Sequence, residues 1–295
     1  MKKVTVRVPA TTANLGPGFD SVGCAFTLYN IISFNLSDEF IIEGCEDQYK
    51  NENNLAILGF DAVLKYSKKE RKGLKVEFEQ IDIPVSRGLG SSSSLLVAGA
   101  LACDNLYDLN LSKEEILCIL NRIEGHPDNL SPAIFGGLTA SMVSEEVPYS
   151  VSYNIHKSID FIAFIPDFKL LTSRARGVLP KTVPFADAVF NESRVAILLK
   201  ALEIADKKLI SISLDDRIHQ PYRKHLIDGY ETVEKIAKEN GALAFCISGA
   251  GSTCLCITND KELFFSKVST ELKNNGFENW RVLPLSVDYE GAKII

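Results

Sequence analysis

The segment Pro84-Val-Ser-Arg-Gly-Leu-Gly-Ser-Ser-Ser-Ser94 leads from an acidic, turn-like stretch (residues 79–84) into the uninterrupted apolar run 95–103. Gly88 and Gly90 have no Cβ, so the backbone there can adopt positive φ angles and approach a ligand closely. The serines that follow can cap the first turn of a helix, whose N-terminus carries about half a positive charge. Arg87 adds a full positive charge beside it. The pattern therefore predicts a loop that binds the phosphates of a nucleotide.

The same segment also fits a plain connector that ends in a good helix cap. It lacks the Lys-Ser/Thr pair of a Walker A loop, and Gly88-Leu-Gly90 lacks the third glycine of a dinucleotide-binding fingerprint. On this loop alone both interpretations stay open, and the rest of the chain has to decide between them.

Composition places the chain among ordinary globular proteins. Its 295 residues, 46% hydrophobic and 24% charged, are enough for one large or two moderate domains. A net charge of −6 argues against a nucleic-acid surface, which needs clustered Lys and Arg. No apolar stretch reaches the ~18 residues of a membrane span. Seven cysteines without a Cys-x-x-Cys pair indicate free thiols in a reducing compartment, so we expect a cytoplasmic protein.

Periodicity predicts a mixture of strands and helices. Strands are expected at residues 3–8, 22–36, 39–44, 74–78, 159–165, 243–247, 253–257 and 280–286. Helices are expected at 53–68, 91–107, 112–123, 129–135, 172–180 (capped by Thr172 or Ser173), 187–206, 207–213, 226–238 and 261–274, and a loop at 219–223. The pattern changes from helix-rich to strand-led near residues 144–150, which predicts domains at 1–150 and 151–295.

Two loops carry polar side chains suited to chemistry. Pro9-Ala-Thr-Thr-Ala-Asn-Leu-Gly-Pro-Gly-Phe-Asp20 is too rich in Gly and Pro for regular structure, so we expect a tight loop that presents Asn14 and Asp20. Glu124-Gly-His-Pro-Asp-Asn129 gathers four polar groups between two helices. Each loop also has a purely structural interpretation, with Asx turns in the first and a helix cap from Asp128 or Asn129 in the second.

Three separated stretches, 9–20, 84–94 and 248–253, resemble in order and spacing the three motifs of the GHMP small-molecule kinases. Within that superfamily, four features resemble the homoserine kinases: Thr12-Ala-Asn-Leu-Gly-Pro-Gly-Phe-Asp20, Glu124-Gly-His-Pro-Asp-Asn129, Ala175-Arg176 with Leu179-Pro180, and His219-Gln-Pro-Tyr-Arg223. The resemblance covers essentially the whole chain and favours the phosphate-loop interpretation. It implies ATP-dependent phosphorylation of L-homoserine to O-phospho-L-homoserine, a step of threonine biosynthesis.

The resemblance also implies a fold and an assembly. The expected fold is α+β, the two-domain GHMP kinase fold, with an N-terminal half like ribosomal protein S5 domain 2 and a ferredoxin-like C-terminal half. The active site would lie between the halves. Members of the family are commonly homodimers, so a homodimer is expected here.

The implied nucleotide-binding residues are Asn54, near the adenine, and the central loop with its flanks: Pro84, Val85, Ser86, Arg87, Gly88, Leu89, Gly90, Ser91, Ser92, Ser93 and Ser94. Ser92 and Glu124 would hold Mg²⁺, a hard cation that prefers oxygen ligands. Glu124, His126, Asp128 and Asn129 form the implied catalytic group. Phosphoryl transfer does not require a strong general base, so the proton acceptor stays open between Asp128, His126 and neither.

On the substrate side, Arg176 and Arg223 match carboxylate-binding arginines, whose guanidinium forks suit a carboxylate. Asn14, Asp20 and Asp128 would receive the ammonium group and orient the hydroxyl, and His126 and Thr172 match further contacts.

The chain departs from the family pattern at a few positions: Ser93 and Ser94 replace alanines, Ser252 replaces a proline, and Gln220 replaces a glutamate. A mevalonate- or pantoate-type kinase and a non-catalytic nucleotide- or metabolite-binding regulator are the alternatives. The two arginines with His126 and Asp128 favour an amino-acid substrate over the first alternative. The presence of Ser92 and Glu124 argues against the second.

Overall fold

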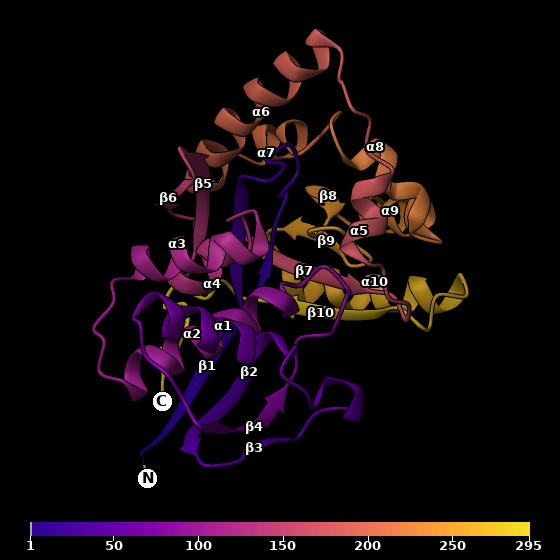
Figure 1. The fold of residues 1–295 in the computed structure, drawn as a ribbon. Helices are drawn as coiled ribbons and strands as arrows, with labels where there is room; N and C mark the ends of the chain where they lie inside the picture. The colour runs from indigo at the N-terminus through magenta and orange to yellow at the C-terminus, as the bar shows by residue number, and fades with distance from the viewer. Residues whose placement is uncertain (1) are drawn as a thin grey trace.

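The computed structural model describes residues 2–295, which fold around two β-sheets joined by helices (Figure 1). The strands of the first sheet are β1 (Lys3–Thr12), β2 (Val22–Ser37), β3 (Phe40–Glu43), β4 (Gly73–Ile81), β5 (Leu138–Ser144), β6 (Val147–Tyr153) and β11 (Lys293–Ile294). Those of the second sheet are β7 (Asp160–Ile165), β8 (Ala244–Ile247), β9 (Cys254–Thr258) and β10 (Arg281–Leu285).

Ten α-helices connect and cover these strands in residues 2–295. They are α1 (Leu55–Tyr66), α2 (Ser91–Leu106), α3 (Lys113–Glu124), α4 (Leu130–Phe135), α5 (Thr172–Gly177), α6 (Phe185–Ile204), α7 (Lys207–Ser213), α8 (Gln220–Arg223), α9 (Tyr230–Glu239) and α10 (Lys261–Asn274). Two short 3₁₀ turns lie at Asp47–Tyr49 and Lys224–Leu226. None of the helices in the described part of the chain is long and apolar enough to cross a membrane.

The first sheet has the order β11-β1-β2-β4-β3, and the β5–β6 hairpin pairs with β2. Val4, Val6 and Val8 alternate along β1, so all three point to one face of the sheet. They are buried in one apolar cluster with Leu96 and Val97 of α2. The C-terminal strand β11 pairs with β1, which brings the two ends of the chain together (Figure 1).

The second sheet has the order β10-β7-β9-β8 and is antiparallel throughout. Its strands and helices follow one another in the βαββαβ order of the ferredoxin-like motif, which confirms the expected fold of this half. One face packs against α9 and α10 in an apolar cluster that includes Phe164 and Trp280.

The opposite face of the second sheet packs against the first half of the chain. Phe26 of β2 lies 5.2 Å from Phe161 of β7, measured between ring centroids. Leu15 and Leu89, from two of the loops singled out in the sequence, are buried in the same cluster. The two halves therefore share a core, and this core holds those loops in place. The division into domains at residues 1–150 and 151–295 stays a prediction. The strand β6 crosses the proposed boundary at residue 150, and β11, from the end of the chain, belongs to the first sheet.

Most expected elements are present, and several local predictions are wrong. The strand β1 continues through residues 9–12, because the ladder with β2 resumes after a register shift at Pro9. The strand β4 runs to Ile81, into the stretch interpreted as a turn. Residues 220–223 form the short helix α8 rather than a loop. The residue that precedes α5 is Leu171, so neither Thr172 nor Ser173 is its N-cap.

The helix α8 forms because of Asp216, whose buried carboxylate accepts hydrogen bonds from the backbone N–H groups of Ile218, His219 and Gln220. The N–H groups of His219 and Gln220 are among those that a helix start leaves without partners. The expected free thiols are confirmed: all seven cysteines are unpaired, and five of them are buried.

Candidate active site

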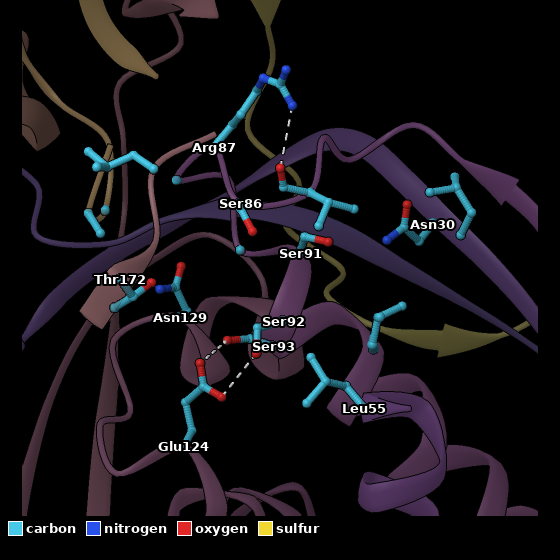
Figure 2. A pocket seen from close by; sticks show the side chains of 18 of the residues that line it. Asn30, Leu55, Ser86, Arg87, Ser91, Ser92, Ser93, Glu124, Asn129 and Thr172 are labelled. Atoms are coloured by element: carbon cyan, nitrogen blue, oxygen red, sulfur yellow. Dashed lines mark hydrogen bonds between the residues drawn. The ribbon is translucent and has the colours of Figure 1, made fainter. Parts of the chain in front are cut away.

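A cavity of about 760 Å³ lies between the two halves of the protein (Figure 2). Its lining comes from the central loop (residues 84–94), the 124–129 loop, and the 249–251 turn, together with Thr172 and Arg176 of α5 and Arg223 of α8. The cavity therefore gathers residues from each stretch that the sequence singled out for chemistry.

The three motif stretches contact one another directly. Gly249 N–H donates to Ala13 O at 2.9 Å, and Thr253 N–H donates to Arg87 O at 3.0 Å. The buried hydroxyl of Ser248 is hydrogen bonded to Thr12 Oγ1 at 2.9 Å. The turn between β8 and β9 thus fastens the first loop and the central loop together.

The two glycines of the central loop have the positive φ angles expected from the sequence, +77° at Gly88 and +70° at Gly90. The close approach they allow is to the protein itself. A Cβ at Gly88 would lie 2.2 Å from Ser248 O, and one at Gly90 would lie 1.9 Å from Thr11 Oγ1. These glycines are needed because the loop is packed against β1 and the β8–β9 turn.

The central loop ends at the N-terminus of α2. The N-cap residue is Gly90, and no side chain caps this helix, which corrects the expectation of a serine cap. The free N–H groups of the first turn therefore border the cavity, where they favour an anion. Ser94 Oγ instead donates to Ser91 O and accepts from Asn30, so it holds the loop rather than lining the cavity.

Glu124, at the C-terminal end of α3, faces the first turn of α2. Ser92 Oγ donates to its Oε2 and Ser93 Oγ donates to its Oε1, both at 3.3 Å (Figure 2). Burial raises the pKa of Glu124, while His126 and the two serine hydroxyls lower it in part. A half-buried carboxylate beside two hydroxyl oxygens would be stabilised by a bound cation, and this oxygen-only donor set fits Mg²⁺. The structure thus brings Ser92 and Glu124 together and adds Ser93 to them.

The guanidinium of Arg87 is engaged by the second half of the protein. Its Nε donates to Pro166 O at 3.0 Å, and Nη2 donates to Asp167 Oδ1 at 3.1 Å. Figure 2 shows it directed away from Ser92 and Ser93. In this conformation Arg87 holds the loop against residues 166–167 rather than offering its charge to the first turn of α2.

The 124–129 loop places His126, Asp128 and Asn129 along the cavity. His126 Nδ1 donates to Asp128 Oδ1 at 2.8 Å, and the Asp128 side chain is only 2% exposed. This hydrogen bond raises the pKa of His126, with burial acting in the opposite direction. Thr11 Oγ1 donates to Asn129 Oδ1 at 2.8 Å. That bond fixes the orientation of the Asn129 amide, with Oδ1 accepting from Thr11, and leaves its NH₂ group available as a donor.

The first loop brings Asn14 and Asp20 to the same region. Asn14 Nδ2 donates to Gly249 O at 3.0 Å, and its Oδ1 accepts from the Asp20 backbone N–H at 2.8 Å. The Asp20 carboxylate is held by Arg176, whose Nη1 and Nη2 donate to its two oxygens at 3.0 and 2.7 Å. Asp20 also lies close to His126 and Asp128, because one ligand atom of each falls within 4.8 Å of the other two.

Arg223 is the largest fully buried side chain of the described residues, at 1% exposure. Its Nε donates to Ala175 O at 3.2 Å, and Nη1 donates to Gly249 O at 3.1 Å. Burial, with the nearby charge of Arg176, lowers the pKa of Arg223 to about 10. His219 Nε2 donates to Gly16 O, so its Nδ1 is an acceptor that faces Arg223 Nη1 at 3.4 Å.

Phe19 and Thr11 have structural roles at the site that sequence reasoning missed. The ring of Phe19 stacks on His219, and the guanidinium carbons of Arg223 and Arg176 lie 5.1 and 5.7 Å from its centroid. Both residues belong to the 9–20 stretch, so the motif itself was the available signal.

Asn54 and Thr172 line the cavity as expected. Asn54 is the N-cap of α1: its Oδ1 accepts from Ala56 N–H and its Nδ2 donates to Tyr49 O. The apolar residues beside it in the lining, which the sequence did not point to, are Tyr49, Leu55, Phe78, Ile81 and Leu95.

The departures from the family motifs are accommodated by local contacts. Ser252 is buried, and its hydroxyl donates to Phe168 O at 2.7 Å. Gln220 Oε1 accepts from the Ile247 backbone N–H at 2.9 Å, which joins α8 to β8. Both side chains therefore support the turn that fastens the loops.

Comparison with known proteins gives consistent results along the whole chain. The family model "GHMP kinases N terminal domain" matches residues 54–137, and "GHMP kinases C terminal" matches residues 198–274. The chain is 40% identical over 294 residues to a homoserine kinase of Clostridium beijerinckii, and 39% identical over 293 residues to one of Clostridium botulinum. Each match covers 99% of this chain and 98% of the relative.

Solved structures agree with these matches. A homoserine kinase from Cytophaga hutchinsonii superposes with a TM-score of 0.89 at 27% identity, covering 100% of this chain and 98% of that one. The mevalonate kinase of Methanococcus jannaschii shares the fold, with a TM-score of 0.72 at 17% identity over 97% of this chain and 98% of its own.

Proposed function

Because the chain belongs to the homoserine kinase family of the GHMP kinases, we propose that its active site transfers the γ-phosphoryl group of ATP to the side-chain hydroxyl of L-homoserine. The product is O-phospho-L-homoserine, an intermediate of threonine biosynthesis. The observation that carries this proposal is the full-length similarity to homoserine kinases, combined with a cavity in which the nucleotide loop and the two arginines lie together.

The nucleotide is assigned to the end of the cavity formed by α1, β4 and the central loop. Leu55, Phe78 and Ile81 offer an apolar surface next to Asn54, which suits a nucleobase. The phosphates are assigned to the loop between Gly88 and Ser93, where the first-turn N–H groups of α2 favour negative charge.

Mg²⁺ is assigned to Ser92 and Glu124, with Ser93 supporting the carboxylate. The raised pKa of Glu124 supports this assignment, since a cation compensates the burial of its charge. When bound, Mg²⁺ neutralises phosphate charge that develops during the transfer. The protein contributes a carboxylate whose orientation is fixed by two hydroxyl donors.

The amino-acid substrate is assigned to the opposite end of the cavity. Arg223 and Arg176 would bind the carboxylate, and Asp20 and Asp128 the ammonium group. Asn14, His126 and Thr172 would complete this region. The buried contacts of Arg223 with Ala175 O and Gly249 O hold its guanidinium in one orientation, so little conformational entropy is lost on binding.

Phosphoryl transfer depends mainly on positioning and charge neutralisation. Asn129, with its amide fixed by Thr11, is assigned to orient the transferred group, and Asp128 to orient the attacking hydroxyl. No residue is assigned the role of a strong base.

The enzyme is further proposed to act in the cytoplasm as a homodimer that binds neither membranes nor nucleic acids. One face of the β5–β6 hairpin supports the dimer. The register pairs Met142 with Tyr149 and Ser144 with Val147, so Met142, Val147, Tyr149 and Val151 point to the same side. All four are at least 40% exposed, and a patch of this kind marks an interface. Sedimentation analysis of the enzyme would test the dimer.

The function is tested by measuring ADP release from ATP and Mg²⁺ with L-homoserine, L-serine, L-threonine, mevalonate, pantoate and galactose. Selective turnover of L-homoserine is expected. Preferred turnover of mevalonate, pantoate or galactose would contradict the substrate assignment, and ATP binding without turnover of any compound would contradict the kinase.

A further inference from the structure

An ion pair joins an acidic and a basic side chain of the region assigned to the amino-acid substrate. Arg176, in the C-terminal half, donates two hydrogen bonds to the Asp20 carboxylate, at 3.0 and 2.7 Å. The two side chains are 37% and 34% exposed, so solvent can reach the pair. The residues lie 156 positions apart in the sequence, and the cavity lies between the halves that carry them.

Each partner also belongs to a cluster of like charge. One carboxylate oxygen of Asp20 lies within 4.8 Å of one of Asp128, and a ring nitrogen of His126, which is hydrogen bonded to Asp128, lies within the same distance of both. Arg176 lies over the same ring of Phe19 as Arg223 and forms a cationic end with it. The site therefore carries its own positive and negative groups, paired with each other, at the positions assigned to the two charged groups of an amino acid.

We propose that the zwitterionic substrate binds by exchange of ion-pair partners. The substrate carboxylate pairs with Arg176, which separates from Asp20, and the substrate ammonium group pairs with Asp20 in its place. This proposal rests on the function proposed above and adds a role for Asp20 in selecting the substrate class. Asp20 therefore weakens the binding of any anionic compound that has no cationic group to pair with Asp20 once Arg176 has separated from it.

The exchange has a measurable consequence for 4-hydroxybutanoate, which is homoserine without its ammonium group. This compound must separate Arg176 from Asp20 but leaves the Asp20 carboxylate without a partner. An accessible, bidentate ion pair contributes up to about a fivefold factor in an equilibrium constant. Removing the Asp20 charge should therefore favour 4-hydroxybutanoate and disfavour L-homoserine.

The variant Asp20→Asn is suited to this test. Asp20 has a φ angle of +52°, a conformation that Asn adopts more readily than most residues. Its backbone N–H, bonded to Asn14, is unaffected by the change. Unaltered thermal unfolding and ATP affinity would show that the fold is retained.

The specificity constant kcat/KM is measured for both compounds in the wild type and in Asp20→Asn, or an inhibition constant where turnover is slow. For 4-hydroxybutanoate, kcat/KM is expected to rise about fivefold in the variant, or the inhibition constant to fall by the same factor. For L-homoserine, a loss of about tenfold or more is expected, since a charged hydrogen bond to the ammonium group disappears.

Asp128→Asn is the matched control, because Asp128 is bonded to His126 rather than to Arg176. It removes a carboxylate from the same end of the site without releasing Arg176. Because Asp128 is also assigned to orient the attacking hydroxyl, this variant is compared by its dissociation constant, and 4-hydroxybutanoate should bind to it less than about twofold more tightly than to the wild type. The exchange is refuted if binding of 4-hydroxybutanoate does not tighten in Asp20→Asn, or if it tightens equally in Asp128→Asn.

A wild-type enzyme that transfers no phosphoryl group to L-homoserine would contradict the proposed function instead. In that case the dissociation constants of the two compounds, measured by calorimetry in the wild type and in Asp20→Asn, would still decide whether the exchange occurs.

Discussion

The substitution Glu124→Gln separates the metal-binding role of this residue from its structural role. A glutamine keeps the size of the side chain and one oxygen acceptor, and the serine hydroxyls, now 3.3 Å from the carboxylate, can reorient to meet its NH₂ group. The free energy of unfolding should therefore change by no more than about 1 kcal/mol. The lost charge should lower kcat by about 100-fold or more, because charge stabilisation of the transition state is lost.

The pKa of Glu124 adds a pH signature in the absence of metal. Burial raises this pKa, so ionised Glu124 disfavours the folded state at neutral pH. The unfavourable contribution is complete above the raised folded pKa and disappears as pH falls toward the ordinary value of 4.5. Without metal, the stability of Glu124→Gln relative to the wild type should therefore be greater at pH 8 than at pH 4.5.

The assay for Glu124→Gln measures ADP release over a range of Mg²⁺ concentrations and, separately, the affinity for metal-free ATP. We expect unchanged ATP affinity, a low kcat, and a half-saturating Mg²⁺ concentration well above that of the wild type. A kcat within about threefold of the wild type at low Mg²⁺ would refute the metal assignment, since such a loss is smaller than removal of one charged ligand should cause.

Four further predictions follow from individual contacts. Thr11→Val should lower kcat about threefold to tenfold with little change in KM, because the Asn129 amide loses the donor that fixes it; an effect on KM alone, in steady-state kinetics, would contradict this role. Arg223→Lys should raise KM for L-homoserine about tenfold by losing the guanidinium fork, whereas Arg174→Lys, at an exposed position of the same short helix as Arg176, should leave KM unchanged. Ser92→Ala should lower kcat about tenfold or more, whereas Ser93→Ala should keep kcat within about twofold of the wild type, since Ser93 supports the carboxylate only. Equal losses of kcat would assign both hydroxyls to the metal. His126→Asn should reduce the melting temperature more at pH 6 than at pH 8. The raised pKa of His126 means that the protonated ring stabilises the fold below its ordinary pKa of 6.5, and this stabilisation is lost as pH rises through the folded pKa. Equal reductions of the melting temperature at the two pH values would show that the charged bond to Asp128 contributes nothing.

Local sequence signals predicted most of the secondary structure. The helix α3 begins where it was expected, at a Ser-x-x-Glu capping box in which Ser112 Oγ accepts from Glu115 N–H at 3.1 Å. Asn54 begins α1 for the same kind of reason. The errors fall where a distant partner decides the conformation. Residues 9–12 look like a loop, yet β2 extends them into a strand.

The chemistry of the site was less predictable than its residues. Sequence motifs identified Arg87, Arg176 and Glu124, but their partners come from other parts of the chain. Arg87 contacts residues 166–167, and Arg176 binds Asp20 across 156 positions. A residue type and its neighbours in sequence do not specify such a partner, because the partner depends on how the two halves pack.

The sequence by itself determined the family, the positions of the loops and the kinds of groups they carry, because these depend on short-range features such as glycine conformations, caps and charged side chains. The tertiary structure decided what each group does. Packing against Thr11 and Ser248 explains the glycines of the central loop, and burial of Glu124 beside two hydroxyls makes it suited to a cation. Burial and electrostatic pairing are properties of surroundings in space, and only the folded chain brings those surroundings together.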